Sequence, residues 1–144
     1  YNPKHFVIHQ GPDGSRVFLP ATPGTQSAPG LIIFRFDAEL FYANAGRFTD
    51  DVKALVAGAP EPVRWVLVDA PALDDVDYSA GQQLEDLVAF LDARQITVGL
   101  VRSDDALLES LRTYEVVGNN SPTRVFEHLR DGLAAFEADR GVAR

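Results

Sequence analysis

The stretch WVLVDAPALDDVDYSAGQQLEDLVAFLDARQITVGLV, residues 65–101, decides the fold. It begins with the apolar run Trp65–Val68 and ends with the apolar run Ile96–Val101, and both runs have the length and composition of buried strands. Between them, residues 80–93 carry apolar side chains at helical spacing, which predicts an amphipathic helix. The apolar face consists of Ala80, Leu84, Leu87, Val88 and Leu91. A strand, a helix and a second strand in this order indicate a largely parallel sheet with helices packed on it.

The same alternation continues on both sides of this stretch. Upstream, residues 31–36 (LIIFRF) predict a buried strand and residues 43–57 predict a helix. Downstream, Ser103 is expected to cap a third helix, whose first turn contains two aspartates that suit the positive helix end. Residues 114–117 are expected to form a short strand, and the pair Ser121-Pro122 is typical of the start of a helix, here the last one.

The first thirty residues have a different composition. The turn sequence Gly11-Pro12-Asp13-Gly14 lies between two short apolar runs, which predicts a β-hairpin at one edge of the sheet, followed by a loop over residues 20–30. The predicted fold class is therefore α/β: a small mixed sheet, with a parallel core plus an N-terminal hairpin, packed with about four α-helices. We expect one domain, in which residues 1–30 form the hairpin and loop, 31–138 form the core, and 139–144 form a frayed polar tail.

Composition limits the classes of function. Thirteen Lys and Arg against 21 Asp and Glu give a net charge of −8, which argues against a nucleic-acid partner and disfavours docking of the whole domain on anionic lipid. The absence of Cys excludes disulfides, thiol catalysis and Cys-based metal sites. The sequence contains no Met and starts at Tyr1, so we expect a piece of a longer protein. No signal peptide and no apolar run of membrane-spanning length occurs in it.

The loop from Asp69 to Gly81 is the densest candidate for a functional site. It follows a predicted parallel strand and leads into a helix N-terminus, where open α/β sheets bind ligands. Four aspartates, Asp69, Asp74, Asp75 and Asp77, place four negative charges within nine residues that contain no base. These charges oppose a phosphate unless a divalent cation or an arginine from elsewhere compensates them. The spacing does not match a calcium-binding EF-hand, and we predict no metal site.

A structural role as a helix cap is sufficient to explain a serine at position 79, without a role in catalysis or modification. Ser79 and Gln82 fit the S-x-x-Q capping box, in which the hydroxyl accepts a hydrogen bond from the first helical turn. A nucleophilic serine needs a base and an orienting acid, and the three histidines (His5, His9 and His128) are expected at the surface or at a sheet edge. Phosphate-binding loops, dinucleotide fingerprints and H-E-x-x-H are missing from the sequence, so we predict no enzyme. Arg35 is expected to pair with nearby carboxylates.

Two stretches resemble the STAS domain (sulfate transporter and anti-sigma factor antagonist) of bacterial sulfate permease (SulP) anion transporters. These are residues 29–45, PGLIIFRFDAELFYANA, and residues 68–80, VDAPALDDVDYSA. The resemblance implies a small mixed sheet packed with helices, and a domain that follows the last transmembrane helix on the cytoplasmic face of the cell membrane. It implies a non-catalytic, regulatory role toward the transmembrane domain of the same chain or a regulatory protein. The isolated piece would be soluble.

The same resemblance suggests two further roles for the loop. The alternative to a transporter domain is a free-standing anti-sigma factor antagonist. These proteins carry the motif D-S-[ST]-G, in which the first Ser is phosphorylated. Here Asp77, Tyr78, Ser79 and Ala80 align with that motif, so Tyr78 departs from it and Ser79 becomes the candidate modification site. Some STAS domains bind guanine or other nucleotides, which makes GTP or GDP with Mg²⁺ a candidate ligand of Asp69, Asp74, Asp75, Asp77, Tyr78, Ser79 and Gly81.

Overall fold

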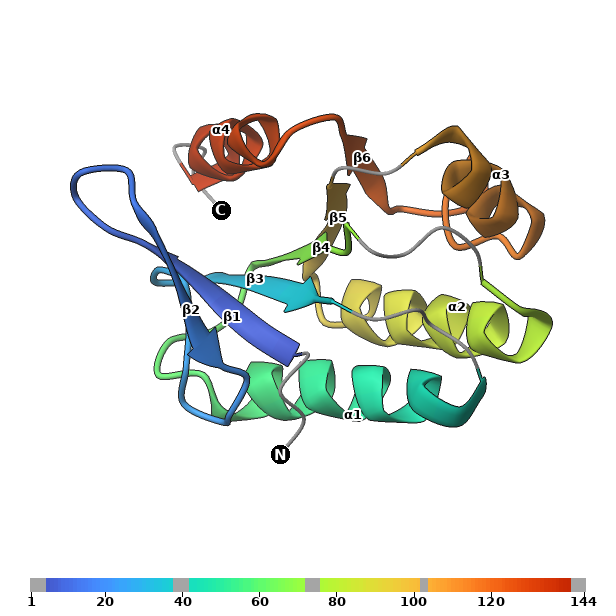
Figure 1. The fold of residues 1–144 in the computed structure, drawn as a ribbon, viewed down its shortest axis with the longest axis horizontal. Coiled ribbons are helices and arrows are strands. Elements are labelled where there is room, and N and C mark those ends of the chain that lie inside the picture. Colours follow the sequence, from blue (N-terminus) through green and yellow to red (C-terminus); the bar gives the residue numbers. More distant parts are fainter. Residues whose placement is uncertain (1–4, 38–41, 72–75, 102–103, 141–144) are drawn as a thin grey trace.

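A computed structural model describes residues 5–37, 42–71, 76–101 and 104–140 (Figure 1). The strands are β1 (His5–Gln10), β2 (Arg16–Pro20), β3 (Leu31–Phe36), β4 (Trp65–Asp69), β5 (Thr97–Val101) and β6 (Arg124–Phe126). The helices are α1 (Tyr42–Gly58), α2 (Tyr78–Asp92), α3 (Asp105–Thr113) and α4 (Leu129–Arg140). The six strands form one sheet in the order β2-β1-β3-β4-β5-β6, in which β3 to β6 are parallel and β1 is antiparallel to both its neighbours. This confirms the predicted fold class.

The N-terminal hairpin forms where the turn sequence predicts it. The Gly14 N–H donates to the Gly11 carbonyl at 3.0 Å, and the Gly11 N–H donates to the Ser15 carbonyl at 2.7 Å. Gly14 has φ +83°, which a residue without a Cβ adopts at little cost, and together these features make a type I turn followed by a glycine bulge. The hairpin places β1 inside the sheet and leaves β2 at its edge.

Each face of the sheet has its own hydrophobic core. Figure 1 shows α1 and α2 on one side of the sheet and α4 on the other. The larger core joins the sheet to α1, α2 and α3, with Phe34 and Leu55 fully buried. The smaller core lies under α4 and is built around Trp65, Leu67 and Phe136. The apolar face predicted for residues 80–93 is confirmed, because all five of its members are buried in α2.

Residues 114–117 do not form the predicted strand. They form the turn after α3, in which Glu115 adopts φ +60° and the Val116 N–H donates to the Leu111 carbonyl at 2.8 Å. This bond, from the residue after a left-handed one back to the last helical turn, is a Schellman-type helix end. It turns Val116 and Val117 into the larger core, which explains two adjacent valines without a strand.

Three other local predictions near the C-terminus were wrong. Ser121 does not start a helix: its hydroxyl donates to the Val116 carbonyl at 2.6 Å, and the next residues enter β6 beside β5. Asp104 caps α3 by accepting from the Leu107 N–H at 2.7 Å, whereas Ser103 lies outside the described residues. Asp139, expected in the frayed tail 139–144, lies in α4 and accepts a hydrogen bond from the Trp65 indole at 2.7 Å, whereas residues 141–144 lie outside the described residues.

Candidate functional site

Asp69, at the end of β4, faces the protein interior. Its side chain is fully buried, and its carboxylate lies 3.5 Å from the Arg35 guanidinium on the neighbouring strand β3. The register places Arg35 directly beside Asp69. Arg35 also donates from Nε to Asp37 at 2.9 Å, and its guanidinium lies 4.8 Å from the centre of the Phe18 ring. Arg35 therefore pairs with carboxylates as predicted, and Asp69 belongs to the framework of the sheet rather than to an open loop.

Asp77 begins helix α2. Its backbone is extended, and its carboxylate accepts a hydrogen bond from the Ala80 N–H at 2.8 Å. The prediction that Ser79 caps this helix is therefore wrong, because Ser79 lies within the first turn with an exposed side chain. A carboxylate satisfies a free N–H and also complements the positive end of the helix, which makes Asp77 the better cap.

Tyr78 stands at the surface beside this cap. Its side chain is 66% exposed, and its ring packs edge-on against Tyr114, with ring centres 5.9 Å apart and planes at 80°. Tyr114 in turn covers Gly81: a Cβ at Gly81 would lie 2.5 Å from the Tyr114 ring. The glycine is required for this close approach, since any side chain there would displace Tyr114.

Tyr114 belongs to this site although the sequence pattern of residues 114–117 predicts a strand. A signal was present, since Tyr114 follows Leu107 and Leu111 at helical spacing. The structure therefore brings Asp77, Tyr78 and Gly81 together with Tyr114 at the N-terminus of α2, while Asp69 turns inward. Asp74 and Asp75 lie outside the described residues. Within the described ranges, no three His, Asp or Glu side chains are grouped so that they could hold a metal ion.

His5 contradicts the expectation of a surface histidine. It is buried against the Phe34 and Phe36 rings, at 4.8–5.6 Å between ring centres, and its Nδ1 bonds the Asp51 carboxylate of α1. The reason is topological: β1 is an interior strand, and α1 supplies Asp51 to the side of the sheet on which His5 lies. His9 and His128 are exposed, as predicted.

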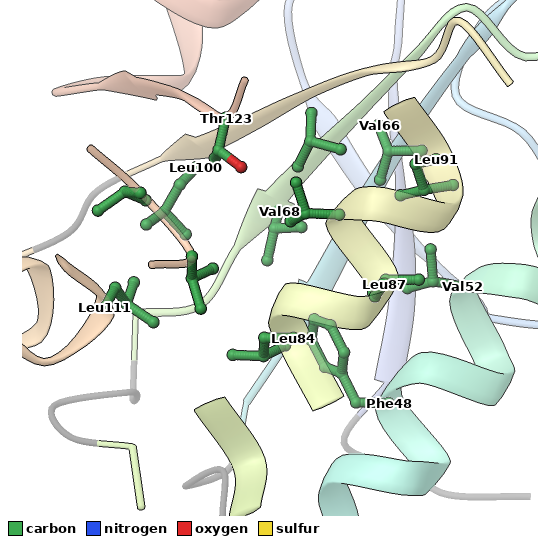
Figure 2. Close-up of a pocket in the computed structure, with 14 residues that line it drawn as sticks. Phe48, Val52, Val66, Val68, Leu84, Leu87, Leu91, Leu100, Leu111 and Thr123 are labelled. Atoms are coloured by element: carbon green, nitrogen blue, oxygen red, sulfur yellow. The ribbon is translucent and has the colours of Figure 1, made fainter. Parts of the chain in front are cut away.

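A small apolar cavity of about 50 Å³ lies between α2 and the sheet (Figure 2). Leu84 and Leu87 of α2, Val98 and Leu100 of β5, and Leu111 of α3 contribute to its lining. Ligand pockets for drug-sized molecules occupy about 300–1,000 Å³. This cavity is therefore a packing gap in the larger core and not a nucleotide pocket.

Comparison with known proteins agrees with this architecture. The sequence model of the STAS domain matches residues 22–132. The chain belongs to the STAS domain family. Among curated proteins, this STAS domain is 31% identical over 114 residues to "Probable sulfate transporter Rv1739c" of Mycobacterium tuberculosis, covering 79% of this chain and 20% of that protein. It is 21% identical over 125 residues to "Sulfate transporter 1.1" of Arabidopsis thaliana, covering 81% of this chain and 19% of that protein. The STAS domain thus spans about a fifth of the length of these relatives.

Solved structures share the fold of this STAS domain. The murine Solute Carrier 26 family member A9 anion transporter, in its inward-facing state, superposes with a TM-score of 0.76 at 19% identity, over 94% of this chain and 22% of that chain. A sulfate transporter family protein from Wolinella succinogenes superposes with a TM-score of 0.64 at 18% identity, over 83% of this chain and 98% of that chain. In the part of the STAS domain that the structure describes, no helix has the length and apolarity to cross a bilayer.

Proposed function

We propose that this STAS domain is the cytoplasmic, non-catalytic regulatory domain of a SulP-type transporter of sulfate or a related anion. The observation that carries the proposal is the 31% identity to a protein described as a probable sulfate transporter, of which the matched region is only a fifth. The remainder of such a chain would contain the membrane-spanning part, and this domain would lie at the membrane's cytoplasmic face. Of the three histidines that could serve as a catalytic base, His5 is closed to substrate, because its imidazole is buried and bound to a carboxylate.

Within this proposal, the surface at the N-terminus of α2 is the contact site for the transmembrane domain or for a regulatory protein. Tyr78 is the most exposed of the large apolar side chains in the described chain, and Tyr114 holds its ring in place. Exposed tyrosines are frequent among the residues that carry binding energy at protein interfaces, because they bury a large ring at little entropic cost. Asp77 gives the edge of this surface a negative charge.

The experiment begins with the DNA upstream of the Tyr1 codon, which should encode a run of apolar helices in the same reading frame. Sulfate uptake by the full-length protein in vesicles would then be compared between the wild type, Tyr78→Ala and the control Val125→Ala, which alters a comparably apolar exposed residue on β6. We expect Tyr78→Ala alone to change uptake at equal membrane abundance. An upstream frame without apolar helices would overturn the proposal and favour a free-standing anti-sigma factor antagonist, in which a kinase and ATP would phosphorylate residues 77–79.

A nucleotide such as GTP or GDP, with Mg²⁺, is a second candidate ligand of the Asp69–Gly81 loop. Two features weigh against binding of a nucleotide without a metal ion. The Ala80 N–H already donates a hydrogen bond to the Asp77 carboxylate, and the negative charge of Asp77 opposes a phosphate at the same helix end. Titration with GTP, with and without Mg²⁺, should be followed by the amide chemical shifts of residues 76–82. Localised shifts that appear only with Mg²⁺ would support assisted binding, whereas their absence under both conditions would exclude this ligand.

A further inference from the structure

The negative charge of the chain is concentrated in one stretch. Residues 65–93 contain seven acids and no base, whereas the remainder of the chain contains fourteen acids and thirteen bases. Among these acids, Asp69 lies away from the surface beside Arg35. Helix α2, by contrast, presents carboxylates to the solvent and has no base in its own sequence to compensate them. Its exposed side is therefore a region of negative potential.

One side of α2 combines this charge with the exposed ring of Tyr78. Gln82, Glu85 and Asp86 follow Tyr78 at intervals of four, seven and eight residues, which places them on the same side of a helix. Tyr78, Gln82 and Asp86 are exposed, and Glu85 is half-buried. Within the described chain, neither Glu85 nor Asp86 has an ion-pair or hydrogen-bond partner. We call these four residues the α2 stripe.

The chain covers other partly exposed aromatic rings with its own cations. These pairs, measured from the guanidinium carbon to the ring centre, are Arg35 on Phe18 at 4.8 Å, Arg94 on Phe90 at 3.4 Å and Arg124 on Phe126 at 5.1 Å. Among the described residues, no cation lies over the ring of Tyr78. Because Tyr78 is 66% exposed, its ring is open to a cation from another segment.

The ring and the charge together favour a basic partner that contains arginine. The planar, weakly hydrated guanidinium of arginine stacks on aromatic faces better than the strongly hydrated ammonium of lysine. The carboxylates of the α2 stripe repel phosphate, which disfavours lipid headgroups and free nucleotides on the same surface. Cytoplasmic loops of membrane proteins carry an excess of Lys and Arg, so a transmembrane domain would supply a segment of the required chemistry.

We propose that the α2 stripe binds a basic cytoplasmic loop of the transmembrane domain, in which one guanidinium stacks on Tyr78 and a second cation pairs with Glu85 or Asp86. Seven or eight helical residues separate these two contacts by about 10–12 Å. An extended segment covers this distance in about three residues, at about 3.3 Å each, so the spacing R-x-x-R fits. This inference rests on the proposed function, because it names the chemistry of the partner at the same site.

Two blocked peptides of equal charge, R-G-G-R and K-G-G-K, serve as probes of the 144-residue chain. The amide chemical shifts of residues 76–86 would be followed at low salt, with peptide up to about 10 mM because so small a contact is weak. We expect the arginine peptide to bind about two- to fivefold more tightly, which is the effect of a cation–π contact at an exposed site. Tyr78→Ala should abolish this preference, whereas Tyr78→Phe, which keeps an aromatic ring, should retain it.

The carboxylates are tested separately from the ring. Asp86→Asn should weaken the binding of both peptides by about twofold, because one exposed ion pair is lost. The matched control Glu127→Gln removes one exposed carboxylate between β6 and α4 and should leave the binding of both peptides unchanged. Equal effects of the two substitutions would show attraction by net charge alone and would overturn the proposed site.

The outcomes separate this inference from the proposed function. Equal binding of the two peptides, or the absence of shifts at residues 76–86, overturns the basic partner. If Tyr78→Ala nevertheless changes sulfate uptake by the full-length protein, the contact site stands and its partner is not a basic loop. Conversely, an arginine preference that Tyr78→Ala removes, together with unchanged uptake by that variant, overturns the contact with the transporter instead.

Discussion

The hydrogen bond between Trp65 and Asp139 fixes the end of α4 to the sheet, and its removal should destabilise the domain. The Trp65 indole is 1% exposed and donates to the Asp139 carboxylate at 2.7 Å. Asp139→Ala removes this acceptor and leaves a buried N–H, which costs about 1–3 kcal/mol. The Arg64–Asp139 ion pair, at 3.5 Å between groups about a quarter exposed, adds less than about 1 kcal/mol because water screens it. We expect a total loss near 2 kcal/mol, or a fall in Tm of about 6–8 °C for a chain of this length.

Urea unfolding followed by circular dichroism measures this loss, and fluorescence reports on the same contact because Trp65 is the only tryptophan. Arg64→Met is the matched control, since it removes the ion pair and keeps the indole bond, and it should cost less than about 1 kcal/mol. A double-mutant cycle of Asp139→Ala with Trp65→Phe isolates the bond itself and should give a coupling of about 1 kcal/mol or more. If Asp139→Ala costs no more than Arg64→Met, the hydrogen bond does not stabilise the docking of α4.

Three other substitutions test separate parts of the structure. Arg35→Ala leaves the fully buried Asp69 without its guanidinium and should cost about 3 kcal/mol in urea unfolding, against less than about 1 kcal/mol for Asp37→Ala; equal losses would contradict a buried ion pair. Gln95→Gly should stabilise by about 1 kcal/mol because Gln95 has φ +60°, whereas Gln82→Gly inside α2 should destabilise by a similar amount; the same sign for both would refute the strain argument. Val98→Ile adds one methylene beside the 50 Å³ cavity and should raise the melting temperature through about 0.8 kcal/mol of extra burial; a loss of stability would show that the gap does not accept it.

The strands and helices with strong periodicity could be predicted from the sequence. The strands at residues 31–36 and 65–68 are apolar on both faces because helices cover both sides of a parallel sheet, and this signal is local and unambiguous. The helix predicted at residues 80–93, which corresponds to α2, has one continuous apolar face, so the face that packs against the core was also predictable. The hairpin followed from its turn residues, whose backbone preferences hold in any context.

The predictions that failed used signals that fit more than one structure. Ser121-Pro122 resembles a helix start, but the Ser121 hydroxyl bonds a carbonyl of the preceding turn and the chain continues as β6. Val116 and Val117 resemble a strand, but they are buried through the turn that ends α3. In both places the decisive partner, β5 or the larger core, is distant in sequence, so no local pattern could identify it.

The four aspartates of the Asp69–Asp77 loop show why a charge count in sequence differs from the charge at a site. Asp69 is next to Arg35 only because β3 and β4 align in one particular register, and that pairing takes its charge away from the surface. Asp77 is held by the first turn of α2, where the helix end offsets part of its charge. Among the described residues of this loop and the helix start, the largest exposed feature is therefore an aromatic ring, Tyr78 supported by Tyr114. Such a surface favours recognition of a protein through ring burial over recognition of a free anion, and this is the reason for proposing it as the contact site for a transmembrane domain or a regulatory protein.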